Sequence, residues 1–264
     1  MKEIIIIGSG IAGLSAAITA AEAGVKSTIF SKDYPVRAQS VMAEGGINAA
    51  LDTMGEGDSV SLHFEETMKG GCYIADCDAV RALCENAPKT LMWLSSLGVC
   101  FHRDGERIVL RSFGGQSRKR TAYAKSSTGR AIMTALYDEC IKYEKRGLIS
   151  LKVPYEFAGL ITDGNICAGA YFTEEFTNRT IEKYGPIIMC CGGLAGMLAG
   201  HTTGSLKNTG KAQAILFMQG VRFSNLEMIQ YHPTSIGIPQ KRLLISEAAR
   251  GEGGRLFIER NGNR

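Results

Sequence analysis

A glycine-rich turn near the N terminus constrains the fold of this chain more strongly than any other feature. Residues 3–7, EIIII, form a short β-branched run typical of a buried parallel strand, and GSGIAG follows directly. The alanine-rich segment LSAAITAAEAG predicts a helix that ends at Gly24, and VKSTIF predicts a second strand. This order predicts a βαβ unit built around a G-x-G-x-x-G turn.

The spacing of the three glycines indicates a dinucleotide site. Gly8 would make the tight turn, Gly10 would let the backbone approach a pyrophosphate, and Gly13 would let the helix pack closely on the strand. The N–H groups at the start of the helix would face the phosphates. The motif alone is weak, but its place between a strand and a helix favours dinucleotide binding.

The end of the second predicted strand bears on which dinucleotide binds. An acidic residue commonly stands there and binds a ribose hydroxyl. In this chain the strand ends in Ser31-Lys32, and Asp33 lies just beyond. This departure argues against a simple NAD dehydrogenase and leaves FAD open.

Composition narrows the class of protein. With 264 residues, 45% of them hydrophobic, the chain can bury a sizeable core as one large domain or two small ones. The net charge of +4 comes without a basic block, which argues against nucleic acid as a partner. The longest apolar runs contain glycines, and no signal peptide is recognisable, so we expect a soluble, unprocessed, cytoplasmic protein without membrane spans.

The cysteines give no sign of a metal site. None of the eight forms a C-x-x-C pair, and no histidine stands at zinc-finger spacing, so we expect neither a zinc nor an iron–sulfur centre. We expect reduced, mostly buried thiols of a cytosolic protein. His63 and His102 have no partner at a useful spacing and are predicted to lie at the surface.

The second half of the chain changes character. Residues 149–183 alternate by twos around Asp163-Gly164, which predicts a hairpin. GPIIMCCGGLAG predicts a buried strand entering a Gly-Gly turn, and GKAQAILFMQG predicts a helix. Beyond Gln230 the sequence becomes loop-like, so we expect a domain boundary near residue 230.

The segment YHPTSIGIPQKRLLISEAARGEGG gathers residues that could carry chemistry. Glu247 and Arg250 are three positions apart and would face the same side of a helical turn, where a carboxylate beside a guanidinium can relay protons. His232 and Ser246 could hydrogen-bond an anionic substrate. The same spacing also fits an ordinary surface salt bridge and a loop histidine, and spacing alone leaves both interpretations open.

A set of motifs in a fixed order carries a family resemblance. These are GSGIAG, KDYPVRAQSVMAEGGIN, SFGGQS, TGRA, CCGGLAG, EMIQYHPT and SEAARGEGG. Together they resemble the flavoprotein subunit of succinate dehydrogenase and fumarate reductase, in the superfamily that includes L-aspartate oxidase. The resemblance covers nearly the whole chain. It implies an α/β fold: a Rossmann-like FAD-binding domain of the glutathione-reductase type over 1–230, with a β-hairpin insertion, and the start of a capping domain over 231–264.

The resemblance also implies roles for individual residues. His232 is similar to the family's substrate-carboxylate histidine, and Ser246 stands where the family usually has threonine. Glu247 would bind substrate and pass protons, Arg250 would relay them, and Phe113 would contact substrate. The positions implied to bind FAD are Gly8, Ser9, Gly10, Ala12, Gly13, Ser31, Lys32, Gln39, Ser40, Ala43, Glu44, Gly45, Gly46, Gly192 and Gly193.

The implied reaction is hydride transfer between FAD and a C4 dicarboxylate, fumarate or succinate. The chain holds no cluster ligands, so electrons would enter or leave through a partner or a diffusible donor, and the resemblance implies an iron–sulfur partner subunit. Membrane contact would then be indirect, with the protein peripheral on the inner face of the cell membrane.

The sequence departs from the family at four places. Many membrane-bound members have a histidine, covalently bonded to the flavin, where Gln39 stands, so we expect noncovalent FAD. Lys211 replaces an acidic residue that contacts the cofactor, which puts that contact in doubt. Glu44 replaces a usual glutamine, so its protonation state could tune the flavin potential; a plain surface glutamate is the other interpretation. The family is roughly twice as long as this chain, and the expected arginine acid lies beyond Arg264. We therefore expect the chain alone to lack a complete active site.

Two other functions stay open. L-aspartate oxidase fits the missing flavin-linking histidine, but that enzyme typically has a glutamate where Phe113 stands. A non-catalytic FAD-binding fragment fits the short length.

Overall fold

The chain divides into two compact units. The computed structural model describes residues 3–246, 248–255 and 257. Unit 1 comprises Met1–Ala43 and Gly129–Leu244, and unit 2 comprises Glu44–Thr128 and Ile245–Arg264. This division follows contacts within the chain, and the expected boundary near residue 230 stays a prediction.

A parallel sheet forms the centre of unit 1. Its strands are β1 (Ile4–Ile7), β2 (Ser27–Phe30), β8 (Ile149–Lys152) and β12 (Ile187–Met189), in the order β12-β1-β2-β8. Each neighbouring pair is parallel. Helix α1 (Ile11–Glu22) connects β1 to β2. The βαβ unit predicted from the glycine spacing is thereby confirmed.

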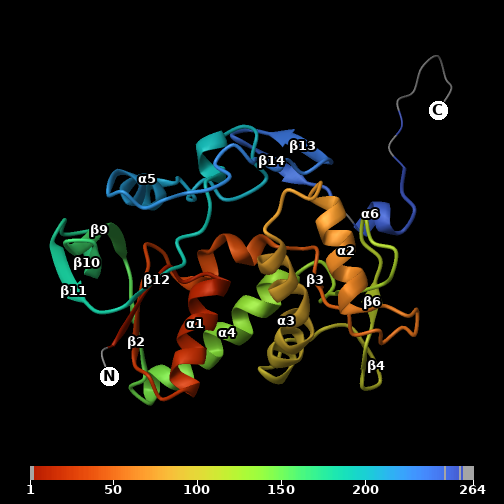
Figure 1. The fold of residues 1–264 in the computed structure, drawn as a ribbon, viewed down its shortest axis with the longest axis horizontal. Helices are drawn as coiled ribbons and strands as arrows, with labels where there is room; N and C mark the ends of the chain where they lie inside the picture. Colours follow the sequence, from red (N-terminus) through yellow and green to blue (C-terminus); the bar gives the residue numbers. More distant parts are fainter. Residues whose placement is uncertain (1–2, 247, 256, 258–264) are drawn as a thin grey trace. The chain divides into compact units, whose positions relative to one another are not determined.

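Burial explains why these segments form this sheet. Ile5, Ile6 and Ile7 are each at most 4% exposed, as expected for strands covered on both faces. Helix α1 buries Leu14, and its small alanines allow a close approach to the sheet. Helix α4 (Thr128–Lys145) lies beside α1, where the thiol of Cys140 is 3.8 Å from the carbonyl oxygen of Leu14 (Figure 1).

An antiparallel sheet packs into the same core. Its strands β9 (Tyr155–Asp163), β10 (Ile166–Glu174) and β11 (Thr180–Tyr184) lie in the order β11-β10-β9. The hairpin predicted at Asp163-Gly164 joins β9 to β10. The rings of Phe30 and Phe172 stack with centroids 3.9 Å apart. This contact fixes the start of the hairpin beside the end of β2.

Short elements complete unit 1. They are η1 (Pro35–Arg37), η2 (Gln39–Met42), η3 (Ala195–Leu198), α5 (Lys211–Met218), β13 (Ser235–Ile238) and β14 (Lys241–Leu244).

Unit 2 combines helices with short strands. Its elements are β3 (Ile47–Asn48), α2 (Val60–Gly70), α3 (Cys77–Ser96), β4 (Arg103–Asp104), β5 (Arg107–Ile108), β6 (Leu110–Arg111), β7 (Thr121–Ala122) and α6 (Ala248–Gly251). Side chains cap both long helices: Ser59 accepts from the N–H of Leu62, and Asp76 accepts from that of Ala79. Strands β3, β7 and β6 form a sheet in that order.

Two expectations from the sequence are wrong. His63 is not at the surface: it is 4% exposed, because α2 turns this face toward Arg120 and α3. The thiols are not mostly buried, since Cys72, Cys77, Cys100 and Cys167 are exposed. Among the described helices, none is both long enough and apolar enough to cross a bilayer.

Candidate functional site

The glycine turn of unit 1 is packed so tightly that only glycine fits. A Cβ atom on Gly8 would lie 2.2 Å from the carbonyl oxygen of Cys190, and one on Gly13 would lie 1.9 Å from the carbonyl oxygen of Gly8. Gly8 also has a φ of +107°, which side chains disfavour. Gly10 caps α1 without a side chain. The start of the helix is therefore open to a ligand that brings negative charge.

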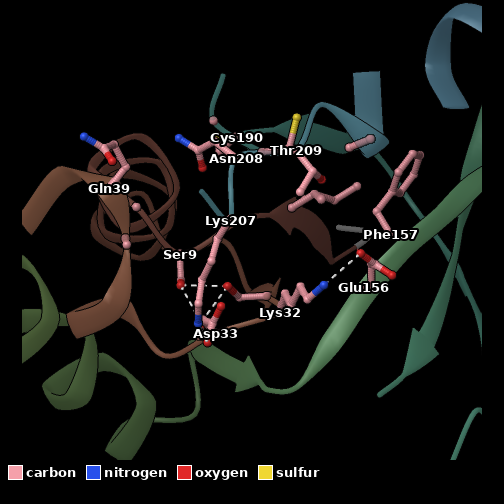
Figure 2. A pocket seen from close by; sticks show the side chains of 18 of the residues that line it. Ser9, Lys32, Asp33, Gln39, Glu156, Phe157, Cys190, Lys207, Asn208 and Thr209 are labelled. Atoms are coloured by element: carbon pink, nitrogen blue, oxygen red, sulfur yellow. Dashed lines mark hydrogen bonds and ion pairs between the residues drawn. The ribbon is translucent and has the colours of Figure 1, made fainter. Parts of the chain in front are cut away.

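A pocket opens at the carboxyl ends of the parallel strands (Figure 2). It is lined by the glycine turn, the end of β2, η2, the start of β9, the end of β12 and the segment 205–213. Crevices at this edge of an open α/β sheet are where nucleotides bind. We call it the nucleotide pocket.

The nucleotide pocket gathers part of the predicted FAD set. The predicted residues that line it are Gly8, Ser9, Gly10, Ser31, Lys32, Gln39, Ser40 and Gly192. Ala12 and Gly13 lie in α1, behind the turn. Ala43 accepts from the N–H of Gly129 at 2.7 Å and so holds η2 against the start of α4. Gly193 faces open space.

Sequence reasoning missed several residues of this pocket. Asp33, Glu156, Phe157, Lys207, Asn208 and Thr209 also line it. Glu156 belongs to no recognisable motif. It lies in the pocket because the N–H of Tyr155 donates to the carbonyl oxygen of Ser31 at 2.9 Å, which places the start of β9 beside the end of β2. The NTG triplet before Lys211 was the available signal for Asn208 and Thr209.

Two lysines hold Glu156. The ammonium nitrogen of Lys32 lies 3.3 Å from one carboxylate oxygen, and Lys211 pairs with the other. Burial raises the pKa of Glu156, but the Lys211 hydrogen bond and the charges of Lys32 and Lys211 outweigh it and leave that pKa below its ordinary value. Lys211, the departure from the family's acidic residue, therefore orients a carboxylate in the pocket.

Gln39 lies at the junction of two cavities. It lines the nucleotide pocket and a second pocket in unit 1, which is also lined by His201, His232 and Arg242. The side-chain oxygen of Gln39 accepts from the N–H of Ser205. The amide NH₂ remains as the polar group of Gln39 that can donate to a ligand.

The second pocket contains the predicted substrate histidine. Nδ1 of His232 lies 2.7 Å from the carbonyl oxygen of Thr234, which fixes the ring orientation. Nε of Arg242 donates to the hydroxyl of Ser235 at 2.7 Å. The pocket thus presents an imidazole and a guanidinium, groups suited to a carboxylate.

In unit 2 the structure brings together Gly45, Gly46 and Phe113. A Cβ on Gly45 would lie 3.2 Å from the Phe113 ring, and one on Gly46 would lie 2.5 Å from the carbonyl oxygen of Ala122. Arg111 donates to the carbonyl oxygen of Gly45 at 2.6 Å, while its guanidinium lies 4.3 Å from the Tyr123 ring centroid. The backbone at Gly45 therefore lies close to the Phe113 ring, and the expected places of these residues beside the flavin and the substrate stay predictions.

Helix α6 places the end of the last motif against the same segment. A Cβ on Gly251 would lie 2.8 Å from the carbonyl oxygen of Ser112 and 3.8 Å from Cα of Phe113. The N–H of Ala249 bonds to the carbonyl oxygen of Ser246, and Arg250 is half-buried. Glu247 lies outside the described residues. Ser246 and Arg250 therefore share unit 2 with Phe113, whereas His232 belongs to unit 1.

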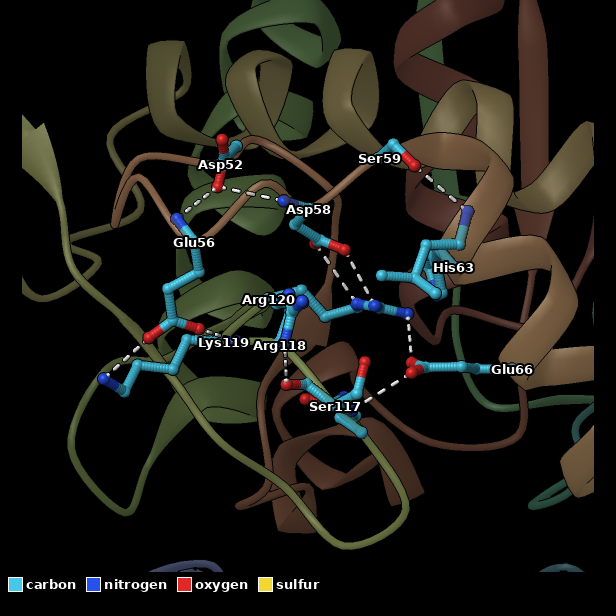
Figure 3. A network of polar contacts seen from close by, with 12 residues as sticks. Asp52, Glu56, Asp58, Ser59, His63, Glu66, Ser117, Arg118, Lys119 and Arg120 are labelled. Atoms are coloured by element: carbon cyan, nitrogen blue, oxygen red, sulfur yellow. Dashed lines mark hydrogen bonds and ion pairs between the residues drawn. The ribbon is translucent and has the colours of Figure 1, made fainter.

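A buried network of charges supports the turn after Phe113 (Figure 3). Arg120 is 1% exposed, and it donates to both oxygens of Asp58, at 2.7 and 3.2 Å. Its third nitrogen lies 2.9 Å from Glu66, whose other oxygen accepts from the N–H of Ser117 at 3.1 Å. The network ties α2 to the segment that carries the phenylalanine.

Comparison with known proteins identifies the family. A family model described as an FAD binding domain matches residues 3–264.

The chain belongs to the FAD binding domain family.

Among curated relatives of this FAD binding domain, the succinate dehydrogenase flavoprotein subunit of Bacillus subtilis is 41% identical over 99% of the chain and 45% of its own length. The fumarate reductase flavoprotein subunit of Mycobacterium tuberculosis is 36% identical over 97% of the chain and 43% of its own length. The chain thus spans about half the length of the curated relatives that it matches. The resemblance drawn from its motifs is confirmed.

Solved structures confirm the fold of this FAD binding domain. A Mycobacterium smegmatis Sdh1 complex matches with a TM-score of 0.88 at 28% identity, over 99% of the chain and 47% of that chain. An Escherichia coli quinol fumarate reductase matches with a TM-score of 0.86 at 28% identity, over 96% and 43%. The α/β class and the Rossmann-like architecture predicted from the sequence are therefore correct.

The residues of the nucleotide pocket fit the ADP portion of FAD. The close packing at Gly8 and Gly13 holds the turn at the start of α1, and the first turn of α1 carries no acidic side chain to repel a phosphate. Ser9 and Ser31 supply hydroxyls that bond to each other at 2.8 Å. Glu156 supplies a carboxylate able to accept from ribose hydroxyls.

Proposed function

We propose that this chain is the FAD-binding portion of a succinate dehydrogenase or fumarate reductase flavoprotein subunit. The observation that carries the proposal is the nucleotide pocket, which combines a glycine turn, an open helix N terminus and a ribose-side carboxylate. Bound FAD would supply hydride transfer to or from a C4 dicarboxylate such as fumarate or succinate.

Residues of the chain would bind the substrate, transfer the proton and contact the cofactor. His232 and Ser246 would bind substrate carboxylates, and Phe113 would pack against the substrate. Glu247 and Arg250 would hold and move a proton beside it. The polar strip Gln39–Ser40 and the Gly45-Gly46 pair would lie along the cofactor, with Glu44 beside it.

The cofactor is proposed to be noncovalently bound. An amide nitrogen is too weak a nucleophile to form the flavin bond that an imidazole can form, and Gln39 is already held by Ser205. The relatives are flavoprotein subunits, and on this basis we propose an iron–sulfur subunit as the electron partner. Location would be cytoplasmic, peripheral on the membrane through partner subunits.

The proposal is tested on the protein that contains this chain. We expect fumarate to reoxidise reduced viologen in its presence, and Glu247→Gln and Arg250→Met to lower kcat by roughly 10²–10⁴, the usual contribution of positioned acid–base groups. Lys142→Met, on the exposed side of α4, serves as the control and leaves kcat unchanged. Absence of fumarate reduction in a flavin-loaded preparation would overturn the proposal.

L-aspartate oxidase remains the second candidate, because Gln39 removes the flavin-linking histidine. Phe113 argues against it, since a carboxylate is expected at that position to bind the substrate amine. Formation of iminoaspartate from aspartate, with no turnover of fumarate and viologen, would reverse this ranking. A chain that binds FAD yet turns over neither substrate as part of its complete protein would instead be a non-catalytic binding fragment.

A further inference from the structure

Four cationic side chains line the nucleotide pocket: Lys32, Arg37, Lys207 and Lys211. Lys32 and Lys211 both pair with Glu156, at the start of β9. Lys207 instead reaches across the pocket to Asp33, where its ammonium nitrogen lies 2.6 Å from a carboxylate oxygen (Figure 2).

Asp33 is joined to the glycine turn. Its carbonyl oxygen accepts from the hydroxyls of Ser9, at 3.1 Å, and Ser31, at 2.8 Å. Ser9 lies between Gly8, at the tight turn, and Gly10, which would let the backbone approach a pyrophosphate. The Lys207 ammonium is therefore held on the glycine-turn side of the pocket, away from Glu156.

The glycine turn lacks a cation of its own. Residues 8–13 carry no ionisable side chain. The N terminus of α1 contributes only about half an elementary charge, whereas a pyrophosphate carries about two negative charges at neutral pH. A lysine beside the turn would supply the missing positive charge and a charge-assisted hydrogen bond.

We propose that Lys207 is a pyrophosphate-binding residue of the nucleotide pocket, drawn from Asp33 onto the phosphates when a dinucleotide binds. The inference rests on the proposed function of this pocket. The Lys207–Asp33 pair is partly exposed, with 51% and 25% of the two side chains accessible. Exposed pairs of this kind are weak, so the ammonium can be shared with a phosphate at little cost.

A purely structural role makes different predictions. If Lys207 only fastened the segment before α5 to Asp33, then removing either partner would have the same effect on binding. If Lys207 binds phosphate, then removing Asp33 frees the lysine and deletes a repelling carboxylate. The variants Lys207→Met and Asp33→Asn then change affinity in opposite directions.

The experiment is calorimetric titration of this chain with ADP-ribose, which has the pyrophosphate but no flavin, and with adenosine, which has no phosphate. We expect wild type to bind ADP-ribose, Lys207→Met to weaken it about tenfold, and Asp33→Asn to strengthen it, with adenosine unaffected by Lys207→Met. Lys207→Arg should restore most of the affinity. Lys142→Met removes an equal charge outside the pocket and should change nothing.

Each contrary outcome has a separate meaning. An ADP-ribose affinity of Lys207→Met within twofold of wild type overturns the inference, as does equal weakening by Lys207→Met and Asp33→Asn, or an equal loss for adenosine. In those cases wild-type binding still supports the nucleotide pocket. If wild type binds neither ADP-ribose nor adenosine, then the proposed function of the pocket fails, and the inference fails with it.

Discussion

At the scale of single residues, the site depends on the absence of a Cβ atom at Gly8 and Gly13. The sequence predicted the roles of Gly8 and Gly13 because the G-x-G-x-x-G spacing reflects a backbone approach that any side chain would block. The structure bears this out with contacts to main-chain atoms, which cannot rotate away. For Gly13 the contact, with Gly8, is local in sequence; for Gly8 the contact is with the distant Cys190, and only the motif spacing marks that glycine.

Replacement of Gly13 by alanine tests this packing. The new methyl group would meet the Gly8 carbonyl oxygen at 1.9 Å, so we expect Gly13→Ala to lower the free energy of unfolding by about 1–3 kcal/mol, the usual cost of overpacking. ADP-ribose binding should fall as well, because the turn must shift. Gly70→Ala, at a helix position with open space, is the control and should stabilise by about 0.5–1 kcal/mol. Urea titration followed by circular dichroism measures both, and equal effects would contradict the account.

Residues such as Glu156 and Lys207 could not be predicted in this way. Each acts through a partner more than a hundred positions away, Lys32 for the former and Asp33 for the latter. Nothing in a local pattern marks such a pair. The contact between Lys32 and Glu156, for example, forms only when β9 lies beside the end of β2.

His63 makes stability depend on pH. Burial first, and then the charge of Arg120, lower the pKa of His63 below its ordinary value of 6.5, while Asp58 and Glu66 oppose the shift. As the pH falls below 6.5, His63 becomes protonated in the unfolded chain but stays neutral in the folded chain. The free energy of unfolding therefore decreases until the pH reaches the lower pKa of the folded state. We expect His63→Leu to flatten the dependence of the urea midpoint on pH in this window. An unchanged slope would show that other groups cause it.

At the scale of elements, the buried network of Arg120 joins α2 to the segment between β6 and β7. The SFGGQS motif was visible in the sequence, but its pairing with α2 was not. Asp58 and Arg120 are far apart in the chain, and a fully buried arginine has no signature in hydrophobic periodicity. The network fastens an irregular, glycine-containing turn to α2 through Glu66.

Breaking that network should be costly. Asp58→Asn would remove the charge of the carboxylate that pairs with two nitrogens of the buried Arg120 guanidinium and leave Glu66 as its remaining ion-pair partner, and we expect a loss of about 3–5 kcal/mol in the free energy of unfolding. The matched control is Asp104→Asn, which breaks the exposed Arg107 pair, where the Asp104 side chain is 71% accessible, and should cost about 0–1 kcal/mol. Fluorescence of Trp93, in α3, reports unfolding of unit 2. Similar losses in the two variants would argue against the network.

At the scale of the whole molecule, the sequence predicted the class of fold and its first βαβ unit but not the complete sheet. Strand β8 was taken as part of the hairpin region, whereas it pairs with β2 in the parallel sheet. Strand β12 lies beside β1 although they are far apart in the chain. Short apolar segments fit either kind of sheet, and only long-range pairing decides between them.

The alkylation rates of the cysteines report on the fold of the whole molecule. Cys72, Cys77, Cys100 and Cys167 are exposed and should be alkylated first. Burial raises the pKa of Cys140 to about 12, so it should react only on unfolding. Cys190 and Cys191 line the nucleotide pocket, and ADP-ribose should slow their labelling in particular. Mass spectrometry of alkylated peptides measures these rates; protection of the four exposed thiols instead would place the ligand elsewhere.

The most direct test of the central claim is titration of the purified chain with FAD, followed by acid precipitation of the complex. The nucleotide pocket and the amide at Gln39 predict saturable binding of one FAD per chain, with all of the flavin released into the acid supernatant. Flavin that stays in the protein pellet would contradict the noncovalent mode. No saturable binding of FAD would contradict the assignment of the pocket itself.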